Sequence, residues 1–345
     1  MIHFRNKICF MLGALLASCL TNSDLHAQLD RVYPLKGSTV QGVVKTITKD
    51  VIKIQVGGDM KDLPINTIRR IIFEGDPGSV GKGRDQILDG QYDTGLVEIE
   101  KTDINKVARD EIKAEFMFYR AFAMGKLALS GRRDPADAAK AMLEFAGKYR
   151  ESWHYYEAAQ MLGDLAMQLG SADKAAQYYA ALASAPFPEF QLQARYLEGL
   201  ALLKSGKAAD ALARFESVIG ASTTSPEAVR FQKMATAGKV AALGESGEID
   251  KAIEALKTLI RENDPSDIEI SSRVYNSQGS VLLKKLDFEG ALLAYLHTDL
   301  LFSAAADAHT EALKQLIELW NKLGQPDRAA ATRTKLKRLY PGAKV

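Results

Sequence analysis

The sequence predicts a mainly α-helical protein, an α-α superhelix preceded by a small β-barrel. Two neighbouring stretches, residues 159–185 and 194–220, repeat one order of glycine, alanine and aromatic residues. A small residue recurs in this context along the helical region, and β-branched runs with period-two alternation are confined to residues 31–74. The recurring small residues are Ala139, Ala175, Ala211, Ala252, Ala291 and Ala329.

Length, charge and cysteine content limit the classes of protein that fit. The 345 residues suffice for two domains or for one array of repeats. The formal net charge of +2 does not indicate a polyanionic partner, so nucleic acid is not expected. Cys9 and Cys19 are the two cysteines, which excludes a disulfide framework or a cysteine-ligated metal site in the rest of the chain. No cofactor and no metal are expected.

The first 27 residues have the pattern of a bacterial export signal. Arg5 and Lys7 precede the apolar run 8–20, which is too short to span a bilayer. This pattern predicts an exported protein of the periplasm or the cell envelope. The alternative, an uncleaved buried helix, fits the charge, length and position of the run less well.

Two ways of removing this signal are open. The residues Leu16-Ala17-Ser18-Cys19 resemble the bacterial motif that precedes a lipidated cysteine. In that case the signal is residues 1–18, and Cys19 carries a lipid that anchors the protein to a membrane. In the other case a signal peptidase cleaves after Ala27. A membrane contact is expected only through the lipid.

A small β unit is expected over residues 30–75. The runs "TVQGVVKTI", "DVIKIQV" and "IRRIIFE" alternate apolar and polar residues, and Gly57-Gly58-Asp59 is typical of a hairpin turn. The unit is similar to SH3-like and Sm-like barrels. That resemblance implies an alternative function, a nucleic-acid-binding protein with a helical repeat tail. Because no aromatic stacking platform occurs in this unit, a structural or protein-docking role is favoured.

Residues 76–83 are expected to form a linker. They follow a strand and precede a helix, as a phosphate-binding loop does, but Asp76 and Gly83 occupy positions where that motif needs glycine and a hydroxyl residue. The segment is therefore predicted to be a flexible hinge.

Paired helices are predicted from residue 84 to residue 345. In each central copy, an apolar helix ends at a glycine that adopts a positive φ, and a second helix follows with its small alanine and an aromatic four residues later. One such pair cannot bury its own apolar face, so it must stack on neighbours. The matched residues are Gly163, Gly170, Ala175 and Tyr179 in one copy, and Gly199, Gly206, Ala211 and Phe215 in the next.

These copies resemble tetratricopeptide repeats. Leu162-Gly163, Gly170, Ala175, Tyr179 and Pro186 match the pattern of that family directly, and the resemblance covers about three quarters of the chain. The spacing between copies exceeds the usual 34 residues, and the early tryptophan is missing from every copy. The resemblance implies a concave groove that binds a protein or peptide partner.

The same register implies which side chains face this groove. Acidic groups lie toward the front of the series and basic groups toward the back, which could orient a charged partner. The other interpretation is that these are ordinary solvated helix faces. The residues are Glu157, Gln160, Asp164, Gln168, Gln193, Tyr196, Lys204, Arg273, Asn276, Ser280, Lys284, Lys314 and Glu318.

The sequence gives little indication of catalysis. The histidines beyond the signal are His154, His297 and His309, and they lack the spacing of a metal site. No Gly-x-Ser-x-Gly nucleophile motif occurs. An enzyme with carboxylates in the groove is the remaining catalytic alternative. The sequence thus predicts a non-catalytic exported scaffold that binds a protein or peptide partner at the cell envelope.

Overall fold

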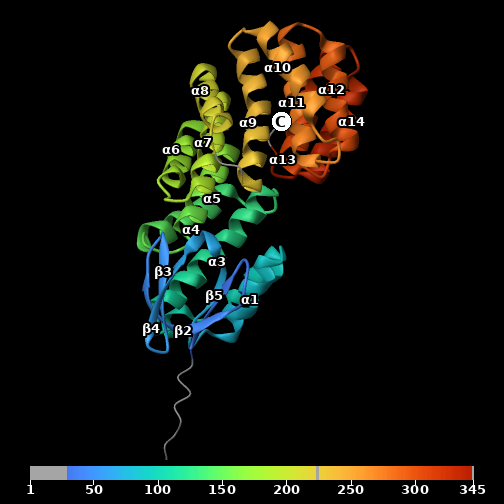
Figure 1. The fold of residues 1–345 in the computed structure, drawn as a ribbon. Helices are drawn as coiled ribbons and strands as arrows, with labels where there is room; N and C mark the ends of the chain where they lie inside the picture. The colour runs from blue at the N-terminus through green and yellow to red at the C-terminus, as the bar shows by residue number, and fades with distance from the viewer. Residues whose placement is uncertain (1–28, 223–224, 344–345) are drawn as a thin grey trace, which may run out of the picture.

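The computed structural model describes residues 29–222 and 225–343. A blue β-sheet lies at one end of the molecule, beside the first helices, and helical pairs continue away from it toward the red C-terminal end (Figure 1). The predicted export signal and Cys19 lie outside the described residues.

The β unit is a five-stranded antiparallel sheet with the strand order β4-β3-β2-β1-β5. The order confirms a small antiparallel β unit, with β4 and β5 as the two edges. The register of β2 against β3 shifts between Val44 and Thr46, and such a bulge bends and twists a strand. The strands are Asp30–Pro34 (β1), Val40–Ile47 (β2), Val51–Val56 (β3), Asp59–Pro64 (β4) and Ile68–Ile72 (β5).

The sheet and the helices share one hydrophobic core. Ile52, Ile54 and Ile71 of the sheet are fully buried in the same cluster as Trp153 and Tyr156 from the helical region. Burying apolar surface on both sides of this junction stabilises the two parts together. The sheet is therefore packed on the helical region, not attached to it by a tether.

The predicted linker is largely helical. Helix α1 (Gly78–Leu88) begins inside residues 76–83 and forms a hairpin with α2 (Tyr92–Ile99). A Cβ added to Gly83 would lie 2.9 Å from the carbonyl oxygen of Gly95, so the two backbones are in close contact. The hinge prediction was wrong here, because the glycines that suggested flexibility permit this close packing of two helices.

Six further helical pairs follow after the 3-10 turn Ile104–Lys106 (η2). In each pair, a first helix packs against a second, and successive pairs stack. The helices are Asp110–Leu129 (α3), Pro135–Lys148 (α4), Tyr155–Gln168 (α5), Ala172–Ala183 (α6), Pro188–Lys204 (α7), Ala208–Ile219 (α8), Pro226–Glu245 (α9), Ile249–Glu262 (α10), Ile268–Lys284 (α11), Phe288–Leu301 (α12), Ala306–Lys322 (α13) and Pro326–Leu339 (α14). No helix among the described residues is long and apolar enough to cross a membrane.

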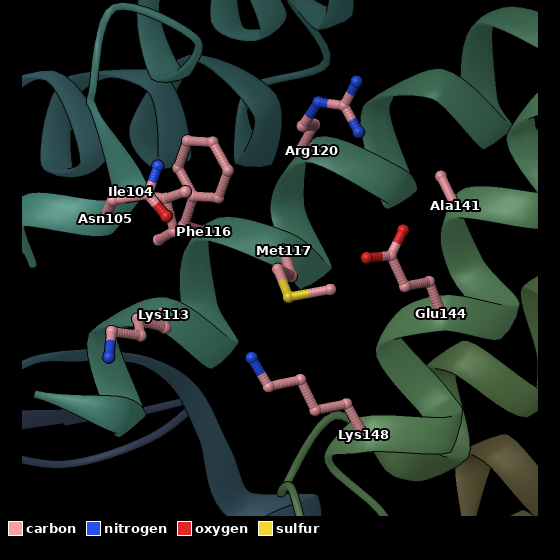
Figure 2. A pocket seen from close by; sticks show the side chains of 9 residues that line it. All are labelled: Ile104, Asn105, Lys113, Phe116, Met117, Arg120, Ala141, Glu144 and Lys148. Atoms are coloured by element: carbon pink, nitrogen blue, oxygen red, sulfur yellow. The ribbon is translucent and has the colours of Figure 1, made fainter.

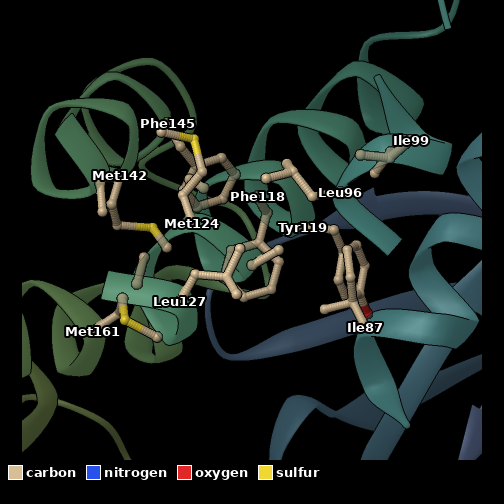
Figure 3. Close-up of a cluster of buried hydrophobic side chains, with 14 of the residues drawn as sticks. Ile87, Leu96, Ile99, Phe118, Tyr119, Met124, Leu127, Met142, Phe145 and Met161 are labelled. Atoms are coloured by element: carbon tan, nitrogen blue, oxygen red, sulfur yellow. The ribbon is translucent and has the colours of Figure 1, made fainter. Parts of the chain in front are cut away.

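The two helices of the central repeats make the predicted contact between an aromatic ring and a glycine. In three of the pairs, α5–α6, α7–α8 and α11–α12, the aromatic of the second helix rests on the glycine of the first, where no side chain intervenes. A Cβ on Gly163 would lie 2.2 Å from the ring of Tyr179, and one on Gly199 would lie 2.6 Å from the ring of Phe215. The cluster that begins this stack includes Ile87, Phe118, Met142 and Met161, among others (Figure 3).

The alanine register is correct for five of the six predicted positions. Ala175, Ala211, Ala252, Ala291 and Ala329 are each at most 1% exposed. In α4 the fully buried alanine is Ala138, and Ala139 is only partly buried. The longer turn before Pro135, at the first turn of α4, shifts this register by one residue.

The C-terminal segment returns to the turn between α3 and α4. Gly131, in the turn between α3 and α4, touches Gly342, because a Cβ on Gly131 would lie 1.9 Å from the Gly342 nitrogen. The side chain of Gln168, at the end of α5, lies beside the same glycine. The helical stack therefore curves back far enough for its last residues to contact its early turns.

Candidate peptide-binding surface

The first helices of successive pairs form a curved wall. Helix α9 packs against both α7 and α11, so it separates them along the wall. Nevertheless, Arg273 Nε of α11 donates a hydrogen bond of 3.0 Å to the Tyr196 hydroxyl of α7. Side chains from two helices on either side of a third can meet only on the concave face. We call this face the inner wall, and Tyr196 and Arg273 were both predicted to lie on it.

Arg273 is the centre of a polar cluster on the inner wall. Its Nη2 donates to Asp307 Oδ2 of α13 at 2.6 Å, and its Nη1 donates to the backbone carbonyl of Glu269. Burial would lower the pKa of Arg273, but the charges of Asp307 and Glu269 and the Tyr196 hydroxyl raise it. The guanidinium therefore joins α7, α11 and α13 and remains charged.

Asp164 of α5 is influenced by the negative charge of Asp307, a member of the same cluster. Its carboxylate accepts a hydrogen bond of 2.8 Å from the Tyr179 hydroxyl. Burial, together with the negative charge of Asp307, raises the pKa of Asp164 to about 6, while Tyr179 and the charge of Lys126 oppose this rise. The charges of Lys126 on α3 and Asp307 on α13 thus both influence Asp164 of α5.

Other predicted residues connect neighbouring helices of the wall. Gln193 donates to Gln160 at 2.9 Å, which joins α7 to α5. Gln168 donates to the carbonyl of Ala128, and Asn276 donates to the carbonyl of Ala308. These amides satisfy backbone carbonyls at the helix contacts, so part of their role is structural.

Two charged residues of the predicted set have partners outside it. Glu157 forms a hydrogen bond of 2.7 Å with His154 Nδ1, and Lys284 forms an ion pair of 2.7 Å with Glu245. Because Arg273 and Lys284 are both paired with acids, the wall does not separate acidic from basic groups in the way the sequence suggested.

Four residues of the predicted set make no hydrogen bond or ion pair to other side chains in the part of the chain that the structure describes. They are partly or well exposed on α7, α11 and α13. Such groups are free to contact a ligand without first breaking an internal bond. These residues are Lys204, Ser280, Lys314 and Glu318.

Sequence reasoning missed Asp307 and Lys126. Asp307 lies in the first turn of α13, and Lys126 lies near the end of α3. No groove-facing residue was predicted on α3, and on α13 the predicted residues, Lys314 and Glu318, lie later in the helix than Asp307. An acid in the first turn of a helix is usually explained by the helix dipole, and that signal carries no information about a distant partner.

A separate hollow lies between α3, α4 and η2, with a cavity volume of about 390 Å³ (Figure 2). Its cations are Lys113, Arg120 and Lys148, and Figure 2 shows Met117 between the two helices. Lys113 and Arg120 already form ion pairs with Asp110 and Glu100. The hollow therefore has little uncompensated charge to select a ligand. It is lined by Ile104, Asn105, Lys113, Phe116, Met117, Arg120, Ala141, Glu144 and Lys148.

The described ranges contain no candidate metal-binding site. No group of three or more histidine, cysteine, aspartate or glutamate side chains there could hold an ion.

Comparison with known proteins defines the class of this fold. Residues 122–189 match the tetratricopeptide repeat family. The helical part of the chain is therefore a tetratricopeptide-repeat-like solenoid, a fold that typically mediates protein–protein interaction. No curated protein matches the sequence significantly.

Two solved structures show the same fold. A tetratricopeptide repeat protein from Parabacteroides merdae shares 14% sequence identity, with a TM-score of 0.55, and the match covers 76% of this chain and 91% of that one. A Rap protein complexed with Competence and Sporulation Factor shares 15% identity, with a TM-score of 0.51, and the match covers 76% of this chain and 73% of that one.

The pKa of Asp164 leads to a prediction. Between pH 4 and 6 the folded protein binds more protons than the unfolded chain, so this group makes the free energy of unfolding fall as pH rises through that window. Asp164→Asn removes the effect and should stabilise the fold at pH 7.5 by about 1–3 kcal/mol. Chemical denaturation at pH 7.5 and pH 4 measures this, and the gain should vanish at pH 4. Glu318→Gln on α13 is the control, and a destabilised Asp164→Asn protein at pH 7.5 would contradict the assignment.

Proposed function

We propose that this protein is a non-catalytic scaffold that holds an extended segment of a partner protein against its inner wall. The observation that carries the proposal is the Tyr196–Arg273–Asp307 cluster, in which side chains from α7, α11 and α13 meet on the concave face. Tyr196 is buried and Arg273 is largely buried, and they hold the exposed carboxylate of Asp307 in a fixed position on this face. Preorganisation lowers the entropic cost of binding.

The inner wall supplies suitable groups for such a segment. Ser280 offers a hydroxyl, Lys204 and Lys314 offer cations, and Glu318 offers a carboxylate, so the wall can bond both peptide groups and charged side chains. The Rap protein of the same fold, complexed with Competence and Sporulation Factor, supports the idea that such a solenoid accommodates another molecule.

We propose further that this scaffold works outside the cytoplasm, at the cell envelope. The support is the charge and length pattern of the first 27 residues. In this proposal, a lipid on Cys19 would anchor the folded region to a membrane, whereas cleavage after Ala27 would release it. Either would leave the described residues unchanged.

The proposal does not include nucleic acid. Two cations of the sheet and its junction lie over aromatic rings, Arg70 over Tyr33 and Arg109 over Phe73. Both guanidinium groups are already bonded to carboxylates, of Asp85 and of Asp30. These two cations are therefore already neutralised by carboxylates and are not free to bind a phosphate backbone.

Site-specific photo-cross-linking in the native cells tests the proposal. A photoreactive residue at Ser280 or Lys314 on the inner wall should give an adduct with a partner, and one at Asp210 on the outer face of α8 should not. A peptide that matches the cross-linked segment should bind the purified protein, and Arg273→Met should weaken that binding about tenfold.

The same cells report on location. Adducts should be recovered from the envelope or periplasmic fraction. Equal adduct yields from Ser280 and Asp210 would contradict the binding proposal. Recovery of the full-length chain from the cytoplasm alone would contradict export.

A further inference from the structure

We propose that residues 340–343 hold the helical stack closed around the inner wall and limit the entry of a partner segment. We call these four residues the latch. They follow the last helix, α14, and they touch the turn between α3 and α4, so they connect the two ends of the stack. The control of entry rests on the proposed binding function, whereas the closure itself does not.

One side of the latch is attached to the helices that it follows. The Tyr340 hydroxyl lies 2.7 Å from His309 Nδ1, and the two rings meet edge to face with centroids 5.5 Å apart. His309 is buried, and its Nε2 lies 2.6 Å from Asp299 Oδ1, which also accepts from Lys335 Nζ at 2.6 Å. Because this network joins α12, α13 and α14, the first residue of the latch has a defined position.

The other side of the latch touches the opposite end of the stack. The Ala343 N–H donates to the Tyr340 carbonyl at 2.9 Å, so the chain makes a tight turn around Gly342. A Cβ added to Gly342 would lie 2.4 Å from the Gly131 Cα, and one added to Gly131 would lie 2.6 Å from the Gly342 Cα. So close an approach is possible only where neither residue has a side chain, and the two backbones are therefore in direct contact.

The glycine at position 342 is explained by this contact and not by its own backbone. Gly131 has a φ of 75°, so its conformation alone favours glycine. Gly342 does not have a positive φ, and an alanine could adopt its backbone conformation. What excludes a side chain at Gly342 is the neighbouring turn between α3 and α4.

Gln168 links the latch to the inner wall. It is one of the residues predicted to face the groove, and a Cβ on Gly342 would lie 3.2 Å from its amide nitrogen. That nitrogen donates to the Ala128 carbonyl, whereas Gln168 Oε1 is buried with no hydrogen-bond partner among the described residues. An unpaired buried acceptor is unfavourable, so the closed arrangement leaves a group that a donor from a partner would satisfy.

The two ends of the stack also approach each other across the inner wall. Asp307, in the first turn of α13, bonds to Arg273, and its charge influences Asp164 of α5. The start of α13 therefore lies opposite α5 across the concave face. In this proposal, a partner segment reaches the polar cluster by passing between these ends, so their separation sets how readily it enters.

The contact made by the latch is of a kind that can open. Its nearest atoms are backbone atoms of two glycines and the amide of Gln168, so it buries little apolar area. The clusters between successive helices instead contain fully or almost fully buried side chains such as Phe215 and Leu316. Opening the latch should therefore separate the two ends of the stack and leave each pair folded.

Distances between spin labels test the closure without any partner. The native cysteines of the full chain are first removed as Cys9→Ser and Cys19→Ser. Labels are then attached at Arg133→Cys and Arg338→Cys, two exposed positions near the α3–α4 turn and the end of α14. Pulsed electron paramagnetic resonance should give one narrow distance distribution. Gly342→Ala should broaden it and shift it to longer distances, because a methyl group has no room at this contact.

Two further variants distinguish opening from unfolding. Gly58→Ala, in a turn of the sheet where an added Cβ meets open space, is the matched control and should leave the distribution unchanged. A chain that ends at Tyr340 keeps the bond to His309 but lacks Gly342, so it should open as Gly342→Ala does. Both should keep a melting temperature close to that of the wild type. A broad wild-type distribution, a narrow one in both variants, or a large fall in both melting temperatures overturns the latch.

The accessibility of the inner wall provides a second measurement without a partner. Ser280→Cys, in the chain without native cysteines, should react slowly with a maleimide that carries a bulky polymer. If the open state is populated at about 10% or less, Gly342→Ala should raise this rate about tenfold or more. Asp210→Cys on the outer face of α8 is the control, and its rate should not change. Equal rates at Ser280→Cys with and without Gly342→Ala would overturn the control of entry.

Peptide binding separates the latch from the proposed function. The peptide that matches the segment cross-linked at Ser280 or Lys314 should bind Gly342→Ala about tenfold more tightly than the wild type. Equal affinities would overturn the regulatory role. A stack that opens in the spin-label and alkylation measurements but cross-links no partner contradicts the proposed function and leaves the closure supported.

Discussion

Arg84→Met is expected to lower the free energy of unfolding by about 3–5 kcal/mol. Arg84 of α1 is fully buried, and it pairs with Asp76 at 2.6 Å and with Glu115 at 3.5 Å. Methionine retains the apolar stem and removes the charge. The two buried carboxylates would then lose their cation, and an uncompensated buried charge is among the most destabilising changes in a protein.

Glu115 connects this pair to the helices that carry the site. Its carboxylate accepts a hydrogen bond from Trp153 Nε1 at 2.9 Å and lies 3.1 Å from His154 Nε2, at the start of α5. Burial would raise the pKa of Glu115, but His154, Arg84 and Trp153 hold it below its usual value. Loss of Arg84 should therefore also loosen α5, the helix that carries Asp164.

Equilibrium urea unfolding measures the Arg84→Met effect. Lys82→Met is the matched control, because Lys82 lies on the same helix and its side chain is 62% exposed. That variant should change the free energy of unfolding by less than about 1 kcal/mol. Similar losses in the two variants would contradict the role assigned to the buried network.

Asp30→Asn is expected to cost about 2–4 kcal/mol, because it removes a charge that joins the sheet to the helices. Both Asp30 oxygens accept hydrogen bonds from Arg109, at 2.6 and 3.0 Å. They also accept the backbone N–H groups of Val44 and Glu74. Asparagine cannot accept from all four donors, so at least one buried group loses its partner.

The pH dependence of this second effect has a definite sign. Burial alone would raise the pKa of Asp30, but Arg109 and the two backbone N–H groups outweigh it and lower the pKa. The stabilisation by Asp30 is therefore complete above the unfolded pKa, about 4, and is lost as pH falls through the lower folded value. Thermal unfolding of wild type and Asp30→Asn should differ at pH 7 and converge in acid. Asp59→Asn, on an exposed position of β4, is the control, and a pH-independent difference would contradict this account.

The two buried networks show where sequence reasoning reached its limit. Asp76 was noticed only because it spoils a phosphate-loop pattern, yet the structure uses it as the partner of Arg84. His154 was noted only as lacking the spacing of a metal site, and it stacks on Phe118 with ring centroids 3.7 Å apart. Its bond to Glu115 spans 39 residues, and no local pattern indicates such a pairing.

The candidate surface was predicted unevenly for a similar reason. Tyr196 and Arg273 followed from the helical register, because the period of a helix fixes which side chains share a face. Their contact with each other did not, since it depends on how tightly the stack curves around α9. Asp307, which completes the cluster, was missed because an acid in the first turn of a helix is usually explained by the helix dipole alone.

The sequence by itself determined the repeat. A glycine in the first helix, a glycine turn, and an alanine and aromatic in the second are local requirements of close helix packing, so they can be seen in the residues. Only the tertiary structure decided the partners of Arg84, Arg273 and Asp30 and the contact of the latch with the turn between α3 and α4. Those depend on the angle at which each pair stacks on the next, and small rotations at many interfaces add up to a curvature that no single segment encodes.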